Sequence, residues 1–164
     1  MSGFDNNKKG SFLATIPVAS IELDDDTLTK RCKFNFSYFY KQQASQSFDE
    51  WDHGQLIKLF EKIKDYSNDS LNHWRKQPIG KKSGHVLEVY GAFPSNSDFT
   101  LPKHVPHQAQ WGRFRLESAV RLVGFVLPSD YNNKFHSCGE RYDCNTFYVV
   151  FLDKEHAFYK MERK

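Results

Sequence analysis

The sequence has little cysteine, no long apolar run and only a small excess of positive charge, and each shortage excludes a class of protein. Its three cysteines, Cys32, Cys138 and Cys144, are too few and odd in number for a disulfide framework. No stretch has the length of a membrane-spanning helix, and the first ten residues lack the apolar segment of a signal peptide. We therefore expect a cytoplasmic protein with no membrane partner.

Aromatic side chains, by contrast, are abundant. They make up 16% of the residues, and 39% of all residues are hydrophobic, which is too high for a disordered chain. The length of 164 residues fits one domain. We expect residues 1–30 to form a partly flexible N-terminal extension, in which 12–23 are compatible with an edge strand, and residues 31–164 to form a single domain. The net charge of +3 permits a polyanionic partner and does not require one.

Two periodicities predict the secondary structure. Apolar and polar residues alternate in the predicted strands. The main predicted helix follows a capping box of Ser47 and Glu50, and its apolar stripe at helical spacing consists of Leu56, Leu59, Phe60 and Ile63. The predicted strands span residues 32–40, 111–127 (one bent strand or a hairpin that turns at 117–119) and 146–153, and the predicted helices span 47–67 and 70–77. This order predicts an α+β fold in which one or two helices pack on one face of a largely antiparallel sheet.

Three arginines, Arg113, Arg115 and Arg121, lie inside the most apolar of these predicted strands. Alternation places them, together with Glu117, on the face opposite the apolar side chains. One interpretation is a solvated sheet face, where the arginine stems cover apolar surface and the charged ends reach water. The other is a concave basic face that binds phosphates, because the guanidinium is a rigid bidentate donor. The sequence leaves both open.

Further basic and aromatic groups flank these strands. Lys103 and His104 lie in the loop just before them, and His156, Tyr159 and Lys160 follow the last strand. The end of one antiparallel strand lies near the start of its neighbour, so we expect these groups to converge on the edge of the arginine face. Such a set suits RNA cleavage by a 2′-hydroxyl, which needs groups that transfer protons and a cation that holds the charged phosphorane.

The order of strand, helical segment, loop and further strands resembles the RelE/ParE-type toxin fold, as do the motifs "WGRFRL" at 111–116, "RLV" at 121–123 and "KEHAFY" at 154–159. The resemblance implies a metal-independent endoribonuclease of a bacterial toxin–antitoxin system. In it Arg121 would hold the phosphate, and His156 and Tyr159 would transfer protons or stack on bases. Its partners would be RNA, on the ribosome for some family members, and a protein antitoxin that covers the basic face. The C-terminal part also resembles small uncharacterised bacterial proteins.

These observations predict an RNA-binding protein, with endoribonuclease activity as the finer expectation. The residues expected to bind RNA are Arg113, Arg115, Lys103, His104 and Lys160, and those expected to be catalytic are Arg121, His156 and Tyr159. The alternative is a non-enzymatic protein-interaction module related to antitoxin, immunity or phage-defence proteins, and the mild net charge favours it.

No cofactor and no metal are expected, because the carboxylates do not cluster in the sequence. His136, Cys138 and Cys144 are close together, and imidazole and thiolates are good zinc ligands. No fourth ligand lies near them in the sequence, so we expect two incidental thiols in a loop, with a zinc site and a redox pair as the alternatives.

Overall fold

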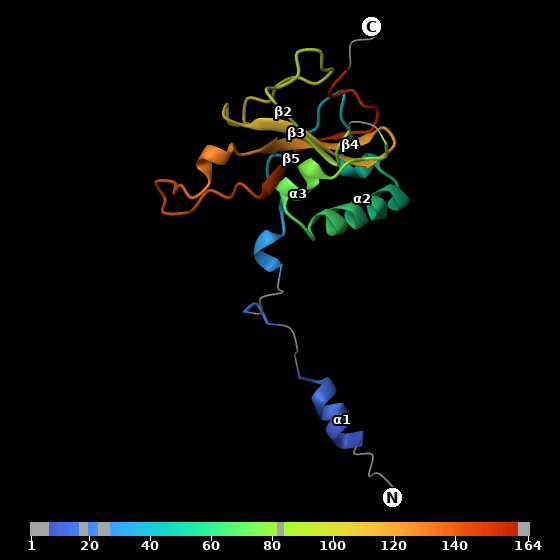
Figure 1. Cartoon of the computed structure of the whole chain (residues 1–164). Helices are drawn as coiled ribbons and strands as arrows, with labels where there is room; N and C mark the ends of the chain where they lie inside the picture. Colours follow the sequence, from blue (N-terminus) through green and yellow to red (C-terminus); the bar gives the residue numbers. More distant parts are fainter. Residues whose placement is uncertain (1–6, 17–19, 23–26, 82–83, 161–164) are drawn as a thin grey trace, which may run out of the picture.

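The computed structural model describes residues 7–16, 20–22, 27–81 and 84–160 (Figure 1). Its helices are α1 (Asn7–Ala14), α2 (His53–Tyr66) and α3 (Leu71–Lys76), and its strands are β1 (Lys33–Asn35), β2 (Leu87–Gly91), β3 (Gln110–Glu117), β4 (Val120–Val126) and β5 (Thr146–Asp153). One sheet has the order β1-β5-β4-β3-β2; β1 and β5 pair parallel, and the other neighbours pair antiparallel. The α+β fold is therefore confirmed.

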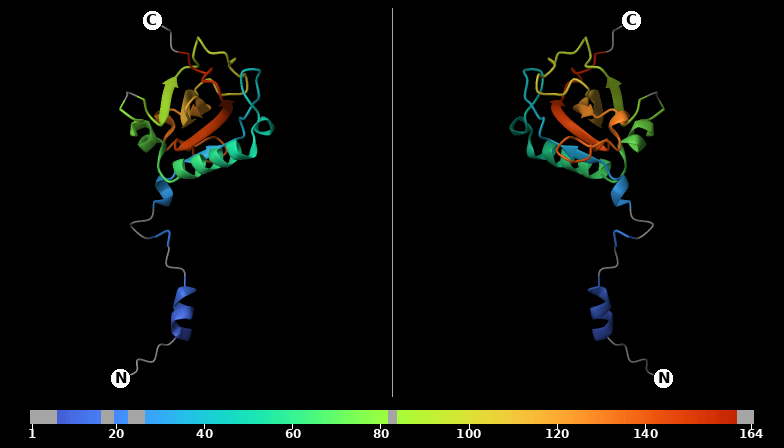
Figure 2. Two further views of the ribbon diagram at one scale, coloured as in Figure 1. Left: turned by 90° about the vertical axis from the view of Figure 1, so that its right-hand side faces the viewer. Right: turned by 90° about the vertical axis from the view of Figure 1, so that its left-hand side faces the viewer.

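Helices α2 and α3 cover one face of the sheet, which we call the helix face (Figures 1 and 2). Leu59 and Tyr66 of α2 are buried there against sheet residues that include Phe114 and Leu122. The predicted apolar stripe is wrong at one position, because Phe60 is 63% exposed on the outer side of α2.

The start of α2 differs from the prediction. The capping box of Ser47 and Glu50 is present, but it closes a single 3-10 turn over Phe48–Glu50. Helix α2 begins later, where Asp52 Oδ1 accepts a hydrogen bond from the Gln55 amide at 2.8 Å in a second capping box. Each box satisfies amides that have no partner inside its own helix.

The run from 111 to 127 is a hairpin, and its turn lies between β3 and β4 at Ser118, which has a φ of 30°. The strand predicted over 32–40 is shorter than expected and ends at Asn35. There the Asn35 side chain accepts a hydrogen bond from the Ser37 amide at 2.9 Å, and the chain then turns from Phe36 to Phe39. Asparagine side chains favour such local turns over a continued ladder.

The opposite face of the sheet, the loop face, is covered by the loop 92–109 and the C-terminal segment 154–160. Phe99 of the loop and Phe158 of the C-terminal segment are buried against Trp111, Phe125 and Phe151 of the strands. Aromatic contacts join the two layers, with ring centroids 4.7 Å apart for Phe99 and Phe151. The sheet is therefore packed on both sides.

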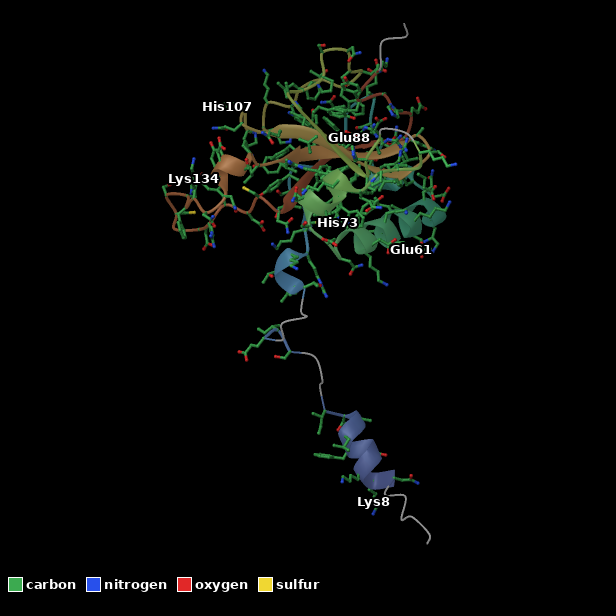
Figure 3. All side chains as sticks on the ribbon, in the orientation of Figure 1. Lys8, Glu61, His73, Glu88, His107 and Lys134 are labelled. Carbon is green, nitrogen blue, oxygen red and sulfur yellow. The ribbon has the colours of Figure 1, made fainter. Side chains whose placement is uncertain are left out.

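Helix α1 lies apart from this packed body (Figure 1), and all of its residues are exposed, as Lys8 illustrates in Figure 3. Residues 12–14 are helical, so the edge strand considered for 12–23 is wrong over these residues. Asp24–Asp26 lie outside the described residues. Within the described part of the chain, no helix combines the length and apolar character needed to cross a bilayer.

Gly124 sets the spacing between β4 and β5, and we predict that Gly124→Ala destabilises the fold. A Cβ at this position would lie 2.0 Å from the Tyr148 carbonyl oxygen, so the backbones of both strands must move in a sheet that is packed on both faces. We expect a loss of about 2–3 kcal/mol in the free energy of unfolding, measured by urea denaturation. The control is Gly10→Ala, where an added Cβ meets nothing within 4 Å; equal stabilities of the two variants would contradict the packing argument.

Candidate functional site

The arginines form a row across the loop face. Arg115 of β3 is the direct cross-strand partner of Arg121 in β4, and Arg121 is the direct partner of Asp153 in β5. Arg113 lies two residues before Arg115, on the same face. Side chains that are directly opposite in an antiparallel pair have Cβ atoms about 5 Å apart. The structure thus brings the three arginines together, as the alternation predicted, and we call them the arginine cluster.

Arg121 is not at an open surface, because it is only 1% exposed. Its Nη1 donates hydrogen bonds to the backbone carbonyls of Ser118 at 2.6 Å and Val120 at 2.9 Å, so the guanidinium holds the turn of its own hairpin. Burial, followed by the like charges of Arg113 and Arg115, lowers the pKa of Arg121 to about 10. Arg121 is therefore not part of a solvated sheet face, whereas Arg113 and Arg115 beside it are half-buried.

Asp153, which sequence reasoning did not single out, controls the turn after β5. Its buried carboxylate accepts hydrogen bonds from the amides of Glu155 at 3.2 Å, Ala157 at 2.9 Å and Phe158 at 2.9 Å. His156 lies inside this turn, with a φ of 61°. An Asp that ends an apolar strand and precedes a polar stretch is a usable signal for such a turn.

Two irregularities in strand register decide which charges reach the loop face. In β3 the register shifts between Arg115 and Glu117, and the Glu117 carboxylate pairs with Lys58 of α2 at 3.4 Å instead of with an arginine. In β5 one extra residue, Val150, interrupts the ladder with β4, so that Asp153 shares the loop face with Arg121. Bulges re-aim side chains in this way.

Tyr90 connects the arginine cluster to the C-terminal segment. The Arg113 Nε donates a hydrogen bond to the Tyr90 hydroxyl, and the Arg113 guanidinium also lies over the Tyr90 ring at 5.9 Å. Tyr159 stacks on Tyr90 with ring centroids 4.5 Å apart and an interplanar angle of 6°. Tyr159 is thus one contact away from the cluster. Lys160 follows it and pairs with Asp98 of the long loop.

Lys103 and His104 lie at the other end of the loop face, in a surface groove between residues 40–44 and 98–104. The groove has a volume of about 940 Å³, and Asp98 also lines it. Its two walls are joined by Gln42, whose side chain accepts a hydrogen bond from the Thr100 amide at 2.8 Å and donates one to the Thr100 carbonyl at 2.6 Å. We call it the 40/100 groove.

Aromatic and basic side chains are exposed together in this groove. Tyr40 is 49% exposed, and the His104 ring meets it edge-on with ring centroids 5.4 Å apart. The other side of His104 stacks on Tyr38, which packs on Phe125 of β4. Phe125 is four residues from Arg121, or about 13 Å along the strand. The groove and the arginine cluster are therefore separate parts of one face.

The proposed catalytic residues do not assemble around a phosphate position. Among the described residues, no hydrogen bond joins His156 or Tyr159 to Arg121, and Tyr159 is stacked on Tyr90 instead. In the segment with the cysteines, His136 Nδ1 lies 3.0 Å from Cys138 Sγ, whereas Cys144 Sγ donates to the Pro128 carbonyl at 3.4 Å. No group of three or more metal-binding side chains occurs within the part of the chain that the structure describes.

Comparison with known proteins leaves the family open. No protein-family model matches the chain, and neither a curated protein nor a solved structure matches it. The likeness to RelE/ParE-type toxins is therefore neither supported nor refuted beyond the α+β architecture, and the site has to be interpreted from its own geometry.

We predict that Arg121→Met is as stable as the wild type or more stable by about 1 kcal/mol, because an apolar side chain of similar length removes a buried charge that has no ion-pair partner among the described residues. Of the two residues whose carbonyls lose their donor, Ser118 is exposed and Val120 is half-buried, so water can replace the lost hydrogen bonds. Urea denaturation of Asp153→Asn provides the contrast, since an amide cannot accept all three backbone hydrogen bonds and should cost about 2–3 kcal/mol. A similar loss in Arg121→Met would show that the turn hydrogen bonds outweigh the cost of burial.

Proposed function

We propose that the protein binds single-stranded RNA along the 40/100 groove. The observation that carries this proposal is the exposed pair of Tyr40 and His104, flanked by Lys41 and Lys103 on the two walls. Proteins that bind single strands combine basic grooves, which follow the phosphates, with aromatic rings on which bases stack. Single strands suit such a site because their bases are unpaired and can stack on aromatic side chains of the protein.

The two lysines contribute differently. Lys41 pairs with Glu50 at 2.8 Å, and this contact raises the pKa of Lys41 and lowers that of Glu50. Lys103 forms no ion pair with any described residue, so its charge is available to a phosphate. Exposed ion pairs are weak, and a phosphate can compete with Glu50 for Lys41.

A line of contacts continues from the groove toward the arginine cluster. Asp98 of the groove pairs with Lys160, the neighbouring Tyr159 stacks on Tyr90, and Tyr90 accepts a hydrogen bond from Arg113. The RNA-binding residues expected from the sequence thus lie at two ends of one face. Cleavage is not part of the proposal, because Arg121 is committed to its turn and the candidate proton-transfer groups do not meet it.

A second candidate function, a protein-interaction module, is favoured by one observation. On α2, away from the sheet, Ile57 is 45% exposed and Phe60 is 63% exposed, and together with Leu56 they line an apolar depression. Exposed apolar patches of this kind mark protein-binding surfaces. This patch is on the opposite side of the molecule from the 40/100 groove.

The RNA proposal predicts that the full-length protein binds a short single-stranded oligoribonucleotide, with an affinity that falls as salt increases. Tyr40→Ala removes the stacking platform and should weaken binding about tenfold. Lys103→Glu should also weaken it about tenfold, by replacing attraction with repulsion. Fluorescence anisotropy with a labelled oligonucleotide measures both effects, and circular dichroism checks that the fold is intact.

The control is Lys64→Glu, which changes the net charge equally but lies on α2, on the other side of the sheet. An equal loss of affinity in Lys64→Glu and Lys103→Glu would mean non-specific attraction, and the groove would not be the site. Undiminished binding by Tyr40→Ala and Lys103→Glu would also refute the proposal. Equal affinity for single-stranded DNA and RNA would mean that the groove binds single strands without a preference for RNA.

A further inference from the structure

The arginine cluster holds more positive charge than the described residues around it balance, and two of its hydrogen-bond donors have no partner among those residues. None of the ion pairs within 4 Å among the described residues involves Arg113, Arg115 or Arg121. The Nε atoms of Arg115 and Arg121 are buried and have no hydrogen-bond partner in the part of the chain that the structure describes. Native proteins rarely leave buried charged donors without acceptors, because the loss of hydration is then uncompensated. A missing acceptor is therefore expected at this place.

The nearest carboxylates are engaged elsewhere. Asp153, the cross-strand partner of Arg121, accepts three backbone hydrogen bonds in its turn. Glu88, the partner of Arg113 on β2 (Figure 3), accepts a hydrogen bond from the His85 amide at 2.8 Å and pairs with the His85 ring. Even when both carboxylates are counted against the three arginines, one positive charge remains.

The side chains of two of the three arginines are also fixed in place before any ligand arrives, as is the backbone of the third. Arg113 is held by the Tyr90 hydroxyl, and Arg121 is held by the carbonyls of its hairpin turn. The backbone of Arg115 is fixed on both sides, by the Val86 carbonyl at 3.0 Å and by the Tyr66 hydroxyl. Binding would then cost little ordering of side chains, which is the condition for a preorganised site.

We infer that Arg113, Arg115 and Arg121 form a binding site for a phosphate group. Arg113 and Arg115 are partly exposed and contact the phosphate, while the buried Arg121 contributes its charge from below. Guanidinium groups suit phosphate and carboxylate alike. A phosphate is favoured because three guanidiniums from two strands can be shared among its tetrahedral oxygens, whereas a carboxylate offers two oxygens in one plane. The site does not depend on RNA binding in the 40/100 groove.

The test is thermal unfolding of the full-length protein in inorganic phosphate, compared with chloride and acetate at the same ionic strength and pH. A ligand that binds the folded state alone raises the unfolding midpoint, and we expect a rise of about 2 °C or more in millimolar phosphate only. Arg113→Gln, Arg115→Gln and Arg121→Met should abolish this rise. Arg31→Gln, which removes an exposed arginine just before the edge strand β1 and outside the cluster, should retain it.

Equal midpoints in phosphate and chloride for the wild type would overturn the inference, as would an equal rise in acetate or a rise that persists in the cluster variants. If those variants do not fold, the wild type alone decides the matter by NMR. Phosphate should then shift the backbone amides of residues 113–121 and 153–159, and no saturable shift there would refute the site.

Two sources of the phosphate are separated by a second titration. Adenosine 5′-monophosphate is compared with oligoribonucleotides that carry a 5′-phosphate or a 5′-hydroxyl. Tighter binding of the nucleotide supports a small phosphorylated ligand, and a gain of about tenfold from the 5′-phosphate supports recognition of an RNA end. If the 5′-hydroxyl oligonucleotide binds through Tyr40 and Lys103 but phosphate has no effect, the groove proposal stands and this one fails. If phosphate raises the unfolding midpoint but no oligonucleotide binds, the phosphate site stands and the groove proposal fails.

Discussion

The register shift at Val150 in β5 is the feature on which the rest of the loop face depends. If these residues alternated regularly along β5, without a bulge at Val150, Asp153 would point to the helix face, where its carboxylate would meet apolar side chains. On the loop face it collects three backbone amides and folds the chain back over the sheet. That turn places Phe158 in the aromatic core and Tyr159 on Tyr90. One inserted residue thus closes the second face of the sheet and orients the group that holds Arg113.

Folding explains one property of the buried Arg121 side chain, its hydrogen bonds, and leaves another, its charge, unexplained. The explained part is the set of hydrogen bonds to the hairpin turn, which an exposed turn can also make with water. The unexplained part is the charge, because burial, followed by the like charges of Arg113 and Arg115, lowers the pKa of Arg121. Because an apolar residue would fill the same space at a lower desolvation cost, the arginine is better explained by a ligand than by folding.

The sequence predicted β1 in part, β3, β4, β5 and the grouping of the arginines, with the hairpin as one of two alternatives, because alternation shows which residues of a strand share a face. It did not predict what covers that side, because the covering segments 92–109 and 154–160 have no periodicity and are placed by long-range contacts such as Gln42 with Thr100. Glu117 was assigned to the wrong face, since a bulge breaks the alternation just before it. Of the groove residues, the sequence predicted only Lys103 and His104 as binding residues. Tyr40 was missed because long-range contacts, and not periodicity, bring the two walls of the groove together.

The two candidate functions occupy opposite sides of the molecule and therefore do not exclude each other. The groove and the arginine cluster lie on the loop face, whereas Ile57 and Phe60 are on the outer side of α2, beyond the helix face. A protein partner bound at α2 would leave the basic face open. An antitoxin that neutralises an RNA-binding surface does so by covering it. Such a partner would contact the arginines on the loop face and not the apolar patch on α2. A partner that binds the apolar patch would instead leave the loop face free, so that both surfaces could be occupied together.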